Sequence, residues 1–242
     1  MKTLLRTSNW PPPLVVAWLD DVLYPAAMYR AGACRTAAEL LRMMFGVDTY
    51  ARFEALYRPG YELEVVRQVI EESLAACDGK TLVKVAAAME SHDPQISPYQ
   101  DAWETFPLLQ TFGVQLALVG EGSRIGQRVV AERLRLHDIF QHMVYADPRI
   151  GRDGWCNAFV MLEAFAGLQR DNAIVICSNA ERVQELASAG WVVVYLQRGR
   201  EQIQEMEQMA PGRIFPVVNL YELPEALGLV AWGDEEEVES HL

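Results

Sequence analysis

Continuous apolar runs alternate with amphipathic stretches along most of this chain. The first run, residues 14–19, follows three prolines and ends in two aspartates. An uninterrupted apolar run bounded by breakers is typical of a strand buried on both faces of a parallel sheet. Similar runs predict further strands at 114–119, 139–145, 173–177, 191–196 and 216–220. Amphipathic stretches between them predict helices at 102–112, 125–134, 156–168 and 183–189. Strands that alternate with helices predict an α/β fold, a doubly wound parallel sheet with helices on both faces.

Residues 26–97 have a different pattern, in which apolar residues recur at helical spacing. Three such segments are 37–45, 63–70 and 82–89, and glycine, proline and aspartate separate them. The pattern predicts a smaller all-helical domain inserted after the first strand. The expected organisation is therefore an α/β core at 1–25 and 98–232, a helical domain at 26–97, and an acidic tail at 233–242.

Composition and charge narrow the classes of protein to which this chain can belong. Hydrophobic residues make up 51% of the chain and charged residues 22%, which favours a folded globular protein. The net charge of -12 disfavours nucleic acid and membrane surfaces as partners. The four cysteines form no CxxC pair, so free thiols are expected and a zinc site is not. The N-terminus lacks the pattern of a signal peptide, and no apolar run is long enough to cross a bilayer, so a cytoplasmic location is expected.

Two adjacent carboxylates, Asp20 and Asp21, follow the first predicted strand. Ligands of open α/β sheets bind outside the carboxyl ends of the strands, so both side chains are candidates for a site. Asp20 is either a general acid/base or a cap for local backbone N–H groups, and Asp21 is expected to be structural.

Residues 198–208 form a charged run, which is expected to be a solvated loop and helix face.

The segment that carries these aspartates resembles the first motif of the haloacid dehalogenase superfamily, an apolar strand followed by Asp-x-Asp-x-Thr-Leu-Tyr. In this resemblance Asp20 matches the second aspartate, the family's general acid/base. The first aspartate, the family's nucleophile, falls on Trp18, and the threonine falls on Val22. The resemblance extends from Val15 to Leu227. It implies a Rossmann-type core with a helical cap at 26–97.

The other polar motifs of the family also fall on different residues. The sequence Leu-Ala-Leu-Val-Gly-Glu-Gly-Ser at 116–123 resembles the second motif, but its phosphate-binding hydroxyl falls on Gly120, beside Glu121. The lysine of the third motif falls near Asp153, with Arg152 adjacent. At 177–183, which resembles the fourth motif, Ser178 and Val183 take the places of the two acidic residues.

The joint change at these motifs indicates a haloacid dehalogenase-like pseudoenzyme without metal or cofactor, in which Asp20 is the only surviving candidate acid/base. We expect a binding, scaffolding or regulatory protein whose partner is an unknown protein or small molecule. A nucleophile and a metal carboxylate work as one unit, so the change of both is expected to abolish phosphotransfer. The expected vestigial pocket consists of Trp18, Asp20, Gly120, Glu121, Arg152, Asp153, Ser178 and Asn179. Trp18 either fills the space left by the lost ligands or stacks on a ligand of its own.

Two alternatives remain open. One is a divergent phosphate-ester hydrolase that uses Asp20, Arg152 and Asp153, in which case Mg²⁺ is its expected cofactor. The other is a protein-interaction module, which uses the surface of the cap or the core and includes self-association into a homo-oligomer. For a protein partner, exposed aromatic residues have to form a patch, and Trp103, Trp155 and Trp232 are the candidates.

Overall fold

A computed structural model describes residues 14–74, 78–150, 154–167, 169–170, 172–198 and 212–229. Its centre is a six-stranded sheet in which every pair of neighbouring strands is parallel. The strands are β1 (Leu14–Trp18), β2 (Gln115–Glu121), β3 (His142–Ala146), β4 (Ala173–Cys177), β5 (Val192–Leu196) and β6 (Ile214–Val217). Their order is β3-β2-β1-β4-β5-β6, so β1 lies in the middle of the sheet. The prediction of a doubly wound parallel α/β fold is confirmed.

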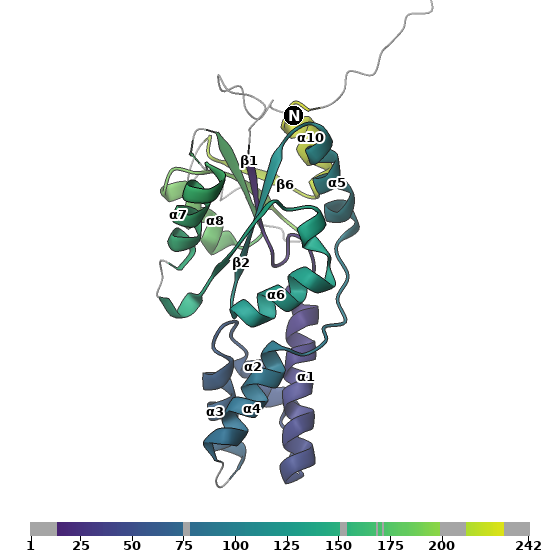
Figure 1. Cartoon of the computed structure of the whole chain (residues 1–242), viewed down its shortest axis with the longest axis vertical. Helices are drawn as coiled ribbons and strands as arrows, with labels where there is room; N and C mark the ends of the chain where they lie inside the picture. The colour runs from purple at the N-terminus through teal and green to yellow at the C-terminus, as the bar shows by residue number, and fades with distance from the viewer. Residues whose placement is uncertain are drawn as a thin grey trace, which may run out of the picture.

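Helices cover both faces of this sheet (Figure 1). One side carries α5 (Gln100–Thr111), α6 (Arg124–Arg133) and the short α10 (Leu223–Ala226), and the other carries α7 (Gly154–Ala166) and α8 (Ala180–Ser188). Three single-turn 3₁₀ helices complete the connections: η1 (Leu136–Asp138), η2 (Pro148–Ile150) and η3 (Leu220–Glu222). Because both faces of β1 are covered, all five of its residues are buried, as a continuous apolar run requires.

The residues between β1 and α5 form a separate group of helices, which extends from the end of the sheet where β1 terminates (Figure 1). The group consists of α1 (Ala26–Phe45), α2 (Tyr50–Leu56), α3 (Glu62–Ser73) and α4 (Gly79–Glu90). Gly46 ends α1 in the left-handed conformation with φ 74°, and the Asp78 side chain caps α4 by accepting from the Thr81 N–H. The helix α2 lies outside the three predicted segments; it is seven residues long and buries only Phe53.

The turn after β1 is held by Arg198, at the end of β5. Its guanidinium donates to the backbone carbonyls of Asp21 and Val22 and forms an ion pair of 2.8 Å with Asp101. It also lies over the ring of Tyr99, 3.5 Å from the ring centroid. The expectation of a solvated loop is therefore wrong for Arg198, and 199–208 lie outside the described residues.

The described residues bear on two predictions from the sequence: that no segment spans a membrane, and that the cysteines are free thiols. No helix in the described ranges combines the length and the apolar character needed to span a bilayer. Cys34 and Cys177 are buried free thiols, whereas Cys77 lies outside the described residues. The cytoplasmic location stays a prediction.

Candidate functional site

The candidate site lies where the strand order reverses. The chain leaves β1 for β2 on one side and returns to β4 on the other, so the carboxyl ends of β1, β2 and β4 meet at one edge. In open α/β sheets such a switch point is where ligands bind. Trp18, Glu121 and Ser178 stand at or just after the ends of these three strands.

Trp18 is the last residue of β1, and its side chain is packed into the protein. Only 4% of the residue is exposed, and its ring centroid lies 6.2 Å from that of Phe159 on α7. The guanidinium of Arg182 lies over the indole, 5.7 Å from the ring, and at a similar distance over Trp155. An indole enclosed in this way acts as a packing group, which favours the space-filling interpretation over stacking on a ligand.

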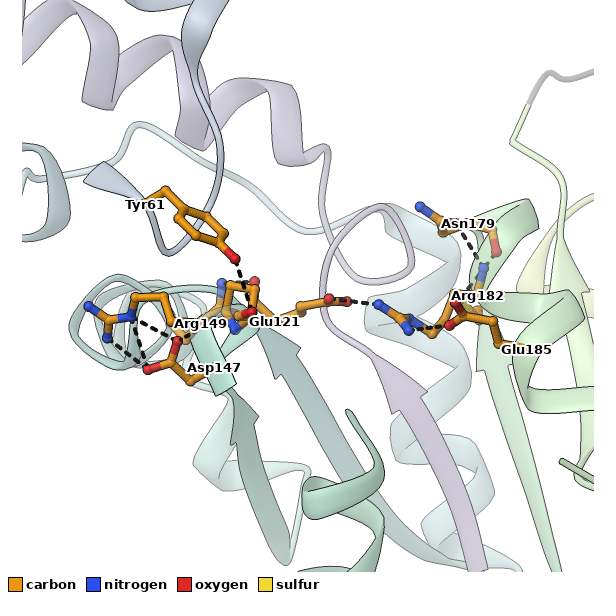
Figure 2. Close-up of polar contacts among 10 residues, drawn as sticks. Tyr61, Glu121, Asp147, Arg149, Asn179, Arg182 and Glu185 are labelled. Carbon is orange, nitrogen blue, oxygen red and sulfur yellow. Dashed lines mark hydrogen bonds and ion pairs between the residues drawn. The ribbon is translucent and has the colours of Figure 1, made fainter. Parts of the chain in front are cut away.

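Arg182 is the functional residue that the sequence interpretation missed. It lies in the first turn of α8, whose N-terminus is capped by the Asn179 side chain, and it joins two strand ends through an ion pair of 2.7 Å with Glu121. It also forms an ion pair with Glu185 on its own helix (Figure 2). Its side chain is 16% exposed and that of Glu121 is 30% exposed, so solvent screens this ion pair only in part. The only sequence signal for this role is a cation one helical turn from a strand end.

Asp20 lies two residues beyond β1, and its environment differs from that of Trp18. The hydroxyl of Tyr24 donates a hydrogen bond of 2.7 Å to its Oδ1. Burial raises the pKa of Asp20 from 3.8 to about 7, and the negative charges of Asp21 and Glu121 act in the same direction. Near neutral pH the carboxyl is therefore divided between its protonated and ionised forms.

The second aspartate has a structural role. Asp21 has a left-handed backbone with φ 58°, which an aspartate tolerates better than most residues. Its Oδ1 accepts the N–H of Ala26, the first residue of α1, so that one of the unpaired donors at this helix end is satisfied.

Gly120 leaves room for a neighbouring side chain. A Cβ at this position would lie 2.5 Å from Oε1 of Gln127 and 3.2 Å from the ring of Tyr145. A serine or threonine at position 120 therefore does not fit unless Gln127 moves. The absence of a hydroxyl here has a packing reason.

The residues after β4 are held by backbone contacts. The Ser178 hydroxyl donates to the backbone carbonyl of Asp20 at 3.4 Å, which links the ends of β4 and β1. Cys177 is fully buried, and burial raises the pKa of its thiol to about 12, so it remains protonated. Ser178 therefore supplies a hydroxyl that holds a turn, and Cys177 is a buried thiol.

Two cavities open on this edge. The Asp20 cavity, of about 330 Å³, lies between the turn after β1, α6 and the helical group. It is lined by Asp20, Asp21, Tyr24, Ala26, Ala27, Tyr29, Arg30, Tyr57, Pro59, Glu62, Ser123, Gly126 and Gln127. The Arg182 cavity, of about 530 Å³, is lined by Tyr61, Glu121, Ala146, Pro148, Gly154, Asn179, Glu181, Arg182 and Glu185. Tyr61 reaches across from the helical group and donates to the carbonyl of Pro148 (Figure 2).

The described residues do not fit a magnesium site. Mg²⁺ requires oxygen ligands in octahedral geometry, usually one or two carboxylates with water. Among the carboxylates at this edge, Glu121 is paired with Arg182, Asp21 accepts the N–H of Ala26, and Asp20 has a raised pKa. Across the described ranges no three acidic, histidine or cysteine side chains are grouped closely enough to hold a metal ion.

The remaining sequence candidates have different outcomes. Arg152 and Asp153 lie outside the described residues. Val183, which takes the place of the second acidic residue in the resemblance, is fully buried in the core, and Arg182 contacts the residues at the strand ends. Trp155 is also buried, at 8% exposure, so it contributes to no aromatic surface patch.

Of the other two aromatic candidates, Trp103 is 47% exposed, and Trp232 lies outside the described residues. A patch that contains Trp103 stays a prediction.

Comparison of the sequence with protein-family models gives no match, and neither does comparison with curated proteins. The fold, by contrast, matches solved structures over nearly its whole length. The 2-haloacid dehalogenase from Pseudomonas syringae pv. Tomato DC3000 has a TM-score of 0.66 at 17% identity, covering 90% of this chain and 98% of that one. The chain has the haloacid dehalogenase-like fold.

Two further structures with this fold extend the comparison to other hydrolases. A haloacid dehalogenase-like family hydrolase from Xanthomonas campestris has a TM-score of 0.61 at 16% identity, covering 91% of this chain and 96% of that one. A predicted phosphoglycolate phosphatase from Haemophilus somnus 129PT has the same TM-score and identity, covering 88% and 96%. At such low identity the likeness establishes the haloacid dehalogenase-like fold but not the chemistry.

Proposed function

We propose that this protein has the haloacid dehalogenase-like fold without the chemistry of that superfamily, and that it acts by binding. The observation that carries the proposal is the buried Trp18 at the end of β1, covered by Arg182. In the resemblance this position belongs to the attacking aspartate. An indole has neither the charge nor the oxygen that attack on phosphorus requires.

The ion pair beside Trp18 supports the same proposal. Arg182 neutralises Glu121, the last residue of β2. Metal-assisted phosphotransfer uses a divalent cation to offset negative charge, whereas here the cation beside Trp18 is a guanidinium. A metal ion bound by Glu121 would have to displace Arg182.

A turnover assay tests this proposal. The full chain is incubated with Mg²⁺ and a panel of phosphate monoesters, together with 2-chloropropionate as a haloacid, and product is measured against protein concentration. We expect no product above that of the Asp20→Asn variant. Asp138→Asn, a change of an exposed aspartate that is paired with Arg135, is the matched control.

Hydrolysis that requires Asp20 but not Asp138 would overturn the proposal. It would support the second candidate function, a divergent phosphate-ester hydrolase. The observation that favours this candidate is the pKa of Asp20, which at about 7 suits a general acid/base. Asp20 also lines a cavity large enough for a small substrate. Against this second function, the described residues contain no group of three side chains that could hold a metal ion, and in the resemblance Trp18 stands at the position of the family's nucleophile.

A further inference from the structure

The Asp20 cavity is rich in carboxylates. Asp20, Asp21 and Glu62 line it, and Arg30 is the one cationic side chain among its lining residues. Arg30 is exposed, whereas Glu62 is only 4% exposed and accepts the N–H of Gly60 with one oxygen. Negative charge therefore predominates in the enclosed part of the cavity.

Burial raises the pKa of both Asp20 and Glu62. The neighbouring charges that act on Asp20 come from Asp21 and Glu121, and both are negative. The positive charge of Arg149 acts on Glu62 in the opposite direction, but burial has the larger effect on its pKa. Carboxyls in such surroundings are costly to ionise. A positively charged ligand in the cavity would offset that cost.

A second observation is an acceptor without a donor. Gln127 on α6 lines the cavity and is 5% exposed, and its Nε2 donates to the carbonyl of Glu121. Its Oε1 is buried and has no hydrogen-bond partner in the described structure. This oxygen packs against Gly120 and is closed off from the cavity, so a ligand reaches it only where the Gln127 side chain moves. An N–H or O–H donor that does so would satisfy it.

Aromatic residues supply the apolar part of the lining. Tyr24, Tyr29 and Tyr57 all line the cavity. The hydroxyls of Tyr24 and Tyr29 are used within the protein, by Asp20 and by the carbonyl of Glu90. Aromatic faces attract cations and also pack against apolar groups.

We propose that the Asp20 cavity binds a small organic ammonium ion, with the N–H donors directed to Asp20 and Glu62 and the apolar body against the tyrosines. A primary ammonium has three donors and no acceptor, which complements carboxylates that share one cavity. The cavity volume lies at the lower end of the range for small-molecule sites, so the ligand is small. This inference rests on the proposed function, because it names the ligand class of a site that binds rather than reacts.

Three probes of similar shape and different charge test the proposal. They are 2-phenylethylamine, which is cationic, 2-phenylethanol, which is neutral, and phenylacetate, which is anionic. Their dissociation constants for the full chain are measured by calorimetry, without Mg²⁺ or phosphate esters, at about pH 8, where Asp20 is ionised. We expect the amine to bind at least about tenfold more tightly than the alcohol, and phenylacetate to bind most weakly.

Substitutions of the two cavity carboxylates test whether the amine binds in the Asp20 cavity. Asp20→Asn and Glu62→Gln are each expected to weaken binding of the amine by about tenfold and to leave binding of the alcohol unchanged. Asp138→Asn, outside the cavity, is expected to change neither. If Asp20→Asn does not fold, Glu62→Gln and the comparison of probes on the unmodified chain still decide the question.

Three results would overturn the proposal: equal binding of amine and alcohol, tighter binding of phenylacetate, or amine binding that both variants leave unchanged. None of these results bears on phosphate-ester turnover. A failure of this proposal and a failure of the proposed function are therefore distinguishable.

Discussion

Two residues near the end of β1 have opposite environments. Trp18 is packed between α7 and Arg182, whereas Asp20 lines a cavity and carries a pKa near neutrality. The apolar run and the two aspartates predict this edge from the sequence. The raised pKa of Asp20 is not predictable in the same way, because it depends on burial beside residues from α1, α3 and α6.

At residue scale, the contribution of Asp20 to the free energy of unfolding depends on pH. Because its pKa is higher in the folded protein than the ordinary 3.8, its contribution to the free energy of unfolding is greatest at low pH and is lost as the pH rises through about 7. The wild-type free energy of unfolding, minus that of Asp20→Asn, is expected to fall by roughly 2 kcal/mol between about pH 5 and about pH 8. Urea titrations at several pH values measure it. A difference that is constant, or that rises with pH, would contradict the assignment.

Trp18 is expected to contribute strongly to stability. Trp18→Ala removes a buried ring and leaves a void next to Phe159, so it is expected to lower the free energy of unfolding by about 3–5 kcal/mol. Trp103→Ala, which removes the same side chain where it is 47% exposed, is the control and is expected to cost about 1 kcal/mol or less. Chemical denaturation compares the two, and equal losses would show that Trp18 is not a packing residue.

At the scale of elements, α8 and β2 are joined through the ion pair between Arg182 and Glu121. Its two side chains are 16% and 30% exposed, so solvent screens the pair only in part. A double-mutant cycle with Arg182→Gln and Glu121→Gln is expected to give a coupling energy of about 1–2 kcal/mol. The same cycle on Arg128 and Glu132, at 64% and 60% exposure, is the control and is expected to give about 0.5 kcal/mol or less. Similar values for the two pairs would mean that Arg182 does not hold the strand ends together.

Hydrophobic patterning predicts elements better than it predicts this ion pair. The strand at 173–177 is predicted to the residue, because its five positions are all buried and apolar. The helix α2 is missed, since it buries one residue and has no periodicity to detect. Arg182 is missed for a different reason. Its importance comes from Glu121 and Trp18, which are distant in sequence, and no pattern within α8 reveals them.

At the scale of the whole molecule, the helical group and the sheet meet through close contacts. Gly60 packs on Pro148, where a Cβ would lie 2.5 Å from the proline Cγ, and Tyr61 donates to the carbonyl of the same proline. On the other side, Gly126 of α6 packs against the hydroxyl of Tyr29. The helical spacing of apolar residues predicts a division of the chain at 26–97, but it does not predict contacts between a glycine and a distant side chain.

Gly126→Ala tests the contact between α6 and α1. The added methyl group overlaps the Tyr29 hydroxyl, and the ring is held against His92 with centroids 4.6 Å apart, so we expect a loss of about 1–3 kcal/mol. Gly79→Ala is the control, because a Cβ there meets no atom within 4 Å. It is expected to be neutral or to stabilise α4 by up to about 1 kcal/mol. Thermal unfolding monitored by circular dichroism measures both, and a Gly126→Ala variant as stable as Gly79→Ala would contradict the contact.

The central claim is that Trp18, Arg182 and Glu121 occupy the position where phosphotransfer would take place. The most direct measurement is a crystal structure of the chain grown with Mg²⁺ and beryllium fluoride, which mimics a phosphoryl group. We expect Arg182 to remain paired with Glu121 over a buried Trp18, with no metal on Asp20. A magnesium ion held by Asp20 and Glu121, with Arg182 displaced, would contradict the account.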